Sequence, residues 1–131
     1  TVDIQNANNL VQWPDQATDN QKFYVRRDGD YYELKSGAFP STGSEAKSID
    51  VNGRQTGNGT NISAYNDSNT DNQRWKFADG SNNFISIRSK LNTNKGLAIL
   101  GNEVNTDRAS VILWDYFPNN NHLFEFVPTS A

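Results

Sequence analysis

The sequence contains no cysteine and a single histidine, and these absences exclude whole classes of chemistry. Without cysteine, the 131 residues have neither a disulfide framework nor a thiol nucleophile, while the cellular compartment stays undecided. One histidine, His122, gives no visible Ser-His-Asp arrangement and no partner ligands at metal-binding spacing. We therefore predict no catalytic residues, no metal site and no cofactor.

Long apolar runs and basic stripes are also missing. No apolar segment approaches membrane-spanning length, so membrane insertion is not expected. The formal net charge is −3, and Lys and Arg are scattered in ones and twos, which makes nucleic acid a poor partner. Hydrophobic residues form a lean 34% of the chain, whereas aromatic residues form a generous 11%. The core is therefore expected to rely on a few large side chains.

The chain does contain a pattern that occurs three times. An aromatic residue precedes a polar residue by eight positions, and a second aromatic residue follows the polar one by two. The three sets are Trp13, Gln21 and Phe23; Tyr65, Gln73 and Trp75; and Trp114, His122 and Phe124. Agreement at every position indicates an internal repeat. We predict a single domain of residues 1–131 with repeats at about 1–47, 48–95 and 96–131.

Short segments bounded by turn residues predict about eleven strands. They fall at residues 2–5, 10–13, 22–26, 31–35, 48–51, 62–65, 74–77, 84–88, 96–100, 111–115 and 123–127. Asn-Gly and Asp-Gly pairs mark tight turns between them, and no segment keeps a helical period over three turns. The expected fold class is all-β, with three units of short strands that close around a pseudo-threefold axis.

One strand of this arrangement is missing at the seam between the chain ends. Either residues ahead of Thr1 supply it, as in a domain excised from a longer protein, or the first copy is compressed.

The residues Asn-Gln-Arg-Trp at 72–75, preceded by Ile-Asp-Val at 49–51 and by Tyr65, resemble the QxW repeat of the ricin B-type β-trefoil lectins. The first repeat matches with Val-Asp-Ile at 2–4, Trp13 and Asn-Gln-Lys-Phe at 20–23. The third departs most, because Ala98 replaces the aspartate and His122 replaces the glutamine. The resemblance covers nearly the whole chain. It implies a β-trefoil fold and sugar binding without catalysis at one shallow pocket per repeat, with only some repeats active.

The resemblance also implies roles for the repeated residues. The aspartate and the asparagine hydrogen-bond sugar hydroxyls, the first aromatic stacks on the ring, and the glutamine braces the aspartate. A carboxylate accepts and a carboxamide both donates and accepts, so the pair can recognise a diol. The predicted sugar-binding residues are Asp50, Tyr65, Asn72 and Gln73 in the second repeat and Asp3, Trp13, Asn20 and Gln21 in the first. In the third, Trp114 and Asn121 lack the charged acceptor and are expected to bind weakly or not at all.

Other interpretations of these residues stay open. The first aromatic of each set is a core residue if its strand turns inward. Separately, Asp3 and Asp50 fit equally well as solvated acids, and Asp50 also fits as a brace for its loop that accepts backbone N–H bonds. We assign the second aromatic of each set to the core, and we expect His122 to substitute for glutamine as a hydrogen-bonding group.

We expect a secreted or extracellular lectin or carbohydrate-binding module whose partner is a galactose-type or polysaccharide glycan. A shallow site binds a monosaccharide with a dissociation constant on the order of a millimolar. Two sites, dimerisation or tethering to another domain would raise the avidity. The alternatives are a protein-interaction trefoil such as a protease inhibitor, presenting the loop at 37–41, and a glycoside hydrolase using two of the 15 Asp and Glu residues.

Overall fold

The computed structural model describes residues 2–5, 9–79, 84–100 and 109–128, and this part of the chain contains ten strands and no α-helix. The strands are β1 (Val2–Gln5), β2 (Asn9–Gln12), β3 (Phe23–Asp28), β4 (Tyr31–Ser36), β5 (Lys47–Val51), β6 (Ile62–Asn66), β7 (Trp75–Asp79), β8 (Ile85–Ser89), β9 (Asn92–Ile99) and β10 (Val111–Asp115). No helix in the described ranges has the length and apolar character needed to cross a membrane. The predicted all-β fold class is confirmed.

Ten of the eleven predicted strands are present, and the eleventh is not. The segment predicted at 123–127 forms only an isolated bridge, in which Phe124 exchanges two backbone hydrogen bonds of 2.8 Å with Ile85. Beyond Phe124 the described backbone has no further ladder partner, so no strand extends from the bridge. The turn expected after β1 falls largely on residues 6–8, outside the described residues.

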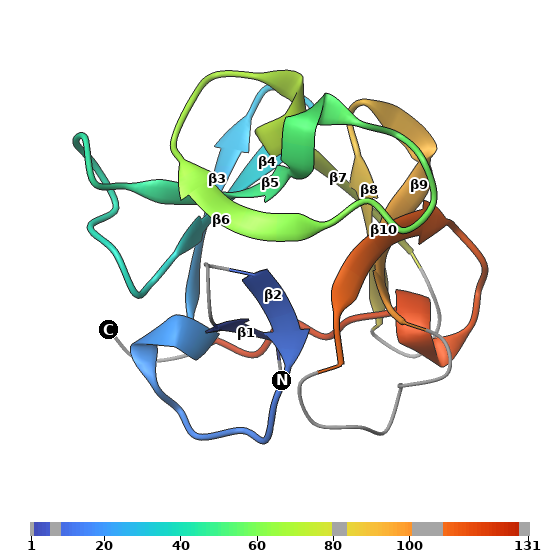
Figure 1. Cartoon of the computed structure of the whole chain (residues 1–131), viewed down its shortest axis with the longest axis horizontal. Helices are drawn as coiled ribbons and strands as arrows, with labels where there is room; N and C mark the ends of the chain where they lie inside the picture. The colour runs from blue at the N-terminus through green and yellow to red at the C-terminus, as the bar shows by residue number, and fades with distance from the viewer. Residues whose placement is uncertain (1, 6–8, 80–83, 101–108, 129–131) are drawn as a thin grey trace.

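The second strands of the three repeats close the threefold arrangement. β2 pairs with β6 through Asn9 and Ser63. Isolated bridges then join Asn61 to Ile112 in β10, and Val11 in β2 to Ser110, which immediately precedes β10. Each repeat therefore contacts the other two, and Figure 1 shows β2, β6 and β10 around a common centre. This is the pseudo-threefold closure that the repeated sequence predicts.

The third and fourth strands form a second ring that is open at one place. β3 pairs with β4, β4 pairs with β7 across the repeat boundary, and β7 pairs with β8. β8 then reaches Phe124 of the third repeat, but no described strand pairs with the other edge of β3. The first repeat has all four strands, so the alternative that the first copy is compressed is wrong. The open position lies beside β3, where Tyr24 and Val25 are exposed.

The core collects aliphatic side chains from all three repeats around one large aromatic. Trp75 has no exposed surface, and its indole N–H donates to the carbonyl of Ile49 at 3.1 Å. Fully or nearly fully buried aliphatics, including Leu10, Ile62 and Leu113, surround the centre. The predicted core role of Trp75 is confirmed, whereas the corresponding Phe23 and Phe124 are only partly buried against the cluster.

Candidate functional site

Three short 3-10 turns hold the polar residues of the repeats in equivalent positions. They are η2 (Asp19–Gln21), η4 (Asp71–Gln73) and η6 (Asn120–His122). In each turn the asparagine side chain donates to a backbone carbonyl at the end of the first strand of its repeat. The three bonds run from Asn20 to Ile4 at 3.3 Å, from Asn72 to Val51 at 3.4 Å and from Asn121 to Ile99 at 3.1 Å. The repeated spacing in the sequence therefore corresponds to a repeated contact in space.

In the second repeat, the turn η4 surrounds a buried carboxylate. Asp50 is 5% exposed, and its Oδ2 accepts hydrogen bonds from Asn72 Nδ2 and Gln73 Nε2, both at 2.9 Å. No described residue donates to the other oxygen, Oδ1. The interpretations of Asp50 as a solvated acid or as an acceptor of backbone N–H groups are therefore wrong.

The pKa of Asp50 is raised above its ordinary value, because burial disfavours the charged form. The hydrogen bond from Gln73 and the positive charge of Arg54 act in the opposite direction. One further feature marks this site. Asn72 Oδ1 is buried and has no hydrogen-bond partner, which is unusual for a buried acceptor in a folded protein.

The first repeat builds the same arrangement more tightly. Asp3 has no exposed surface, and its two oxygens accept from Asn20 at 2.9 Å and from Gln21 at 2.7 Å. Trp13, the aromatic residue of this repeat, is half-buried. Since both oxygens of Asp3 are already engaged, the carboxylate is less available to a ligand than that of Asp50.

The two glutamines support the aspartates. Gln73 is fully buried and also donates to the carbonyl of Asn66 at 2.8 Å, while its carbonyl oxygen accepts from the backbone N–H of Ser68. Gln21 makes the matching bonds to Pro14 and Gln16. Each glutamine therefore ties the aspartate to the loop that follows the aromatic residue, the bracing role implied by the family resemblance.

The third repeat lacks this bracing. Ala98 is 2% exposed and offers no acceptor, and His122 occupies the glutamine position with 4% exposure. His122 Nδ1 is buried and unpartnered, so the expected hydrogen-bonding role is not carried by this atom. Instead, the rings of Tyr116 and Phe117 pack nearly perpendicular to the imidazole ring at centroid distances of 5.9 and 6.0 Å.

Burial lowers the pKa of His122 below its ordinary value of 6.5, which predicts acid sensitivity of the fold. As the pH falls through 6.5, the unfolded chain binds a proton that the folded chain does not, so stability is lost. We expect the free energy of unfolding to decrease between about pH 7.5 and about pH 5.5, and His122→Gln to remove this part of the decrease. Urea unfolding of the parent and of His122→Gln at the two pH values measures the free energies of unfolding. An equal decrease in both proteins would contradict the assignment of this pH dependence to His122.

The aromatic residues differ in exposure, and a surface depression lies beside the aromatic residue of the second repeat. Tyr65 is 60% exposed and Trp114 37%, so the interpretation of these two as core residues is wrong. A surface depression of about 620 Å³ lies beside Tyr65. It is lined by Asn9, Asp50, Asn52, Gly53, Arg54, Ser63, Tyr65 and Asn72. Its volume falls in the range of small-molecule sites, about 300–1,000 Å³.

The sequence interpretation identified three of these lining residues and missed the others. Asn52, Gly53 and Arg54 form the 3-10 turn η3 directly after Asp50 and Val51. The Asn-Gly pair was visible as a turn signal, but its position against Tyr65 depends on the pairing of β5 with β6. Asn9 comes from the first repeat and reaches the depression because β2 lies beside β6.

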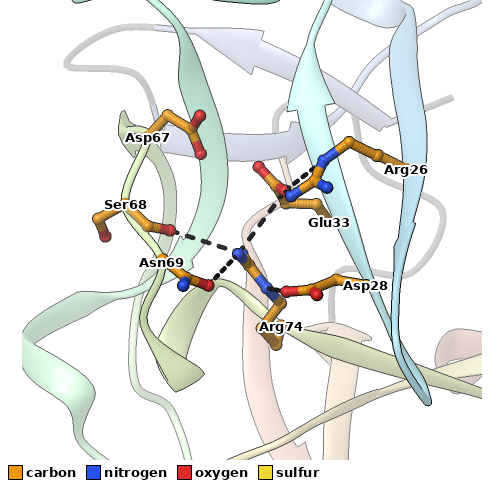
Figure 2. Close-up of a pocket in the computed structure, with 7 residues that line it drawn as sticks. All are labelled: Arg26, Asp28, Glu33, Asp67, Ser68, Asn69 and Arg74. Carbon is orange, nitrogen blue, oxygen red and sulfur yellow. Dashed lines mark hydrogen bonds and ion pairs between the residues drawn. The ribbon is translucent and has the colours of Figure 1, made fainter.

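A second depression, of about 390 Å³, contains a cluster of charges between the first and second repeats (Figure 2). Arg74 is 4% exposed and donates to Asp28 at 2.8 Å and to Asn69 at 2.7 Å, with Glu33 at 3.7 Å. Arg26 also pairs with Glu33. The hydrogen bond from Arg74 lowers the pKa of Asp28.

The charges of this cluster are matched within the protein. Arg26, Lys35 and Arg74 are balanced by Asp28, Glu33 and Asp67, and each takes part in at least one of the ion pairs. The cluster therefore joins β3 and β4 to the loop before β7 and has no net charge to attract a ligand. It was not expected from the sequence, since its members are separated by up to 48 positions, from 26 to 74.

The described residues contain no group of three or more His, Cys, Asp or Glu side chains arranged to hold a metal ion. The polar residues of the depression at Tyr65 include one carboxylate, Asp50. The arrangement can accept hydrogen bonds from the hydroxyl groups of a ligand and donate hydrogen bonds to them. The Tyr65 ring can cover an apolar face of the same ligand.

The fold and the repeated aspartate, aromatic and asparagine sets define a β-trefoil of the lectin type. A family model described as "Ricin-type beta-trefoil lectin domain-like" matches residues 40–114, more than half of the chain. The protein belongs to this family, and the family supports carbohydrate binding in general.

Solved structures agree on the fold. The designed threefold symmetric protein ThreeFoil superposes with a TM-score of 0.85 at 25% identity, over 98% of this chain and 90% of that one. The ricin B-like lectin of Macrolepiota procera, solved in complex with lactose, gives a TM-score of 0.75 at 23% identity, over 95% and 84% of the two chains.

An exo-β-1,3-galactanase from Clostridium thermocellum also contains a similar part, with a TM-score of 0.83 at 21% identity. The match covers 98% of this chain but 27% of the enzyme. No curated protein matches the chain.

Proposed function

We propose that the protein binds carbohydrate without catalysing a reaction, through shallow sites in the first and second repeats. The observation that carries this proposal is the second-repeat depression, where a largely exposed Tyr65 lies beside the buried Asp50 and Asn72. A pyranose ring has an apolar face of C–H groups and a rim of hydroxyl groups. The aromatic ring covers the face, and the carboxylate and carboxamide bind the hydroxyls.

The contacts within the site suit this task because Asp50 is positioned before any ligand arrives. Asn72 and Gln73 both bind its Oδ2, which fixes the carboxylate and leaves Oδ1 to accept from a sugar hydroxyl. The unpaired Oδ1 of Asn72 is a second acceptor that a hydroxyl can satisfy after a small movement of the side chain. Pre-positioned groups lose little conformational entropy on binding, which favours affinity.

Galactose-type sugars and polysaccharide backbones are the proposed ligands, and the proposed location is secreted or extracellular. The Macrolepiota procera lectin bound to lactose supports the galactose class by its shared family and fold. Because a single shallow site binds weakly, on the order of a millimolar, effective binding requires two sites on one chain, dimerisation or tethering. No catalytic step is assigned, and no release of reducing sugar is expected from any of the polysaccharides that bind.

The replacement Tyr65→Ala tests the second-repeat site. In a Trp13→Ala background, which leaves only this site, we expect lactose binding to weaken at least tenfold. Loss of about 60 Å² of covered apolar surface at about 25 cal/mol per Å² corresponds to about 1.5 kcal/mol. Since Tyr65 is 60% exposed, the circular dichroism spectrum and the melting temperature should barely change. Isothermal titration calorimetry against lactose, a galactan and a xylan measures the effect.

Two matched variants make this test specific. Tyr65→Phe keeps the ring and should retain binding, while Tyr24→Ala removes a tyrosine that is 54% exposed on β3, away from the depression. If Tyr65→Ala bound the sugars with the same affinity as Tyr24→Ala, the proposed site would be refuted.

A further inference from the structure

Arg54 lies at the second-repeat depression in a backbone conformation that side chains rarely adopt. Its φ is 57°, in the left-handed region that favours glycine, and it directly follows Gly53 at φ 62°. Ala17, with φ 53°, is the one other non-glycine residue of this kind in the described ranges. A strained residue retained at a candidate site points to a role for its side chain.

The turn that carries Arg54 is fixed to the strands on both sides. The backbone N–H of Asn52 donates to Asn61 at 3.1 Å, and that of Gln55 donates to Asn52 at 3.3 Å. The side-chain oxygen of Asn52 accepts from Ser63 in β6 at 2.7 Å. β6 also carries Tyr65, so the position of Arg54 is set relative to the ring that stacks on the sugar.

The guanidinium group itself is available to a ligand. Arg54 is exposed and makes no hydrogen bond or salt bridge to any residue in the described part of the chain. It is the one cation among the residues that line the depression, and it shares that wall with Asp50 and Tyr65. An unpaired cation beside a site for hydroxyl groups is a second recognition element.

We infer that Arg54 makes the second-repeat site selective for sugars that carry a carboxylate, such as uronic or sialic acids. This inference rests on the proposed function. The planar guanidinium presents two parallel N–H donors that match a carboxylate. In this arrangement Asp50 binds hydroxyls on one part of the sugar ring, and Arg54 binds the sugar carboxylate on another part. The carboxylate of Asp50 and that of the sugar therefore do not compete for the same contacts.

The first repeat provides an internal comparison. Residues 4–9, which follow Asp3, contain no Lys or Arg. The first-repeat site therefore has no counterpart of Arg54 in this segment and should bind acidic and neutral sugars alike. Selectivity for acidic sugars should disappear when the second site is removed and persist when the first is removed.

The experiment compares galacturonic acid with galactose and glucuronic acid with glucose, with sialyllactose against lactose as a separate arm. Binding is followed by NMR titration in the Trp13→Ala background. We expect the carboxylated member to bind about tenfold tighter at low salt, as for a charge-assisted contact, and the preference to shrink at high salt. Arg54→Gln and Arg54→Gly should abolish the preference for the carboxylated sugars, and Arg54→Gly should be at least as stable as the parent because its φ suits glycine.

The outcomes separate this inference from the proposed function. Arg27→Gln removes an exposed arginine of β3 and controls for the change in net charge; it should leave the preference intact. A preference seen in the uronic acid pairs alone, or in the sialyllactose arm alone, supports the inference. It also identifies which class of acidic sugar, uronic or sialic, carries the recognised carboxylate. Equal binding of acidic and neutral sugars, or an undiminished preference in Arg54→Gln, overturns the inference alone. Absence of all sugar binding, with Tyr65→Ala indistinguishable from the parent, overturns the proposed function and the inference with it.

Discussion

Replacement of Asp50 by alanine is expected to weaken sugar binding at the second-repeat site roughly 10- to 150-fold, since a hydrogen bond to a charged group contributes about 1.5–3 kcal/mol. The fold should survive. Gln73 keeps its bond to the carbonyl of Asn66 at 2.8 Å, and Asn72 keeps its longer one to Val51 at 3.4 Å. Neither buried amide loses every acceptor, and the cost of burying the carboxylate is removed.

The raised pKa of Asp50 adds a pH dependence to the same experiment. In the proposed site the ionised carboxylate is the acceptor, and burial shifts its protonation to higher pH than for an ordinary aspartate. Binding at this site should therefore decline on acidification earlier than an exposed carboxylate would titrate. Calorimetric titration across a pH series in the Trp13→Ala background measures this decline.

Asp71→Ala is the matched control, because Asp71 is an exposed acid on η4, next to Asn72, and does not line the depression. It should leave affinity within about twofold, as expected for a surface charge. Equal losses in Asp50→Ala and Asp71→Ala would mean that general charge, rather than a hydrogen bond accepted by Asp50, supports binding.

Trp75→Ala is expected to cost about 3–5 kcal/mol of folding stability, the effect of removing a large buried aromatic side chain. Trp75 is fully buried at the centre of the core, so its removal leaves a cavity and also an unpaired carbonyl at Ile49. Since a domain of this size is stable by only about 5–15 kcal/mol, the loss is large enough to endanger the fold at physiological temperature.

Two comparisons separate the causes of this loss. Trp75→Phe keeps much of the volume but loses the N–H donor to Ile49, so it should cost less than the alanine variant. Phe23→Ala removes the matching residue of the first repeat, which is partly buried, and should also cost less. Chemical denaturation of the three variants gives the free energies, and a Phe23→Ala loss equal to that of Trp75→Ala would show that the repeats contribute equally to the core.

Much of the architecture was predictable because the repeat is a local signal. The alternation of apolar and polar residues, the turn pairs and the spacing from Trp13 to Gln21 are all read within about ten positions of the chain. Ten strands follow these patterns, and the Asn20, Asn72 and Asn121 contacts follow the spacing. The strand prediction at 123–127 failed because a strand needs a partner along its length, and the described pairing there is limited to the bridge between Phe124 and Ile85, which a local pattern does not report.

The sequence by itself determined the three-part β-trefoil and the residues that could meet a sugar, because spacing along the chain fixes which side chains recur at equivalent places. Tertiary structure decided how the three repeats differ: both oxygens of Asp3 accept hydrogen bonds from amides, Oδ1 of Asp50 accepts none from the described residues, and His122 packs without hydrogen-bonding through Nδ1. It also brought Asn9 and Arg54 to Tyr65, and joined Arg74 to Asp28. Burial and contacts between distant segments arise only when the repeats pack together, and no local pattern carries that information.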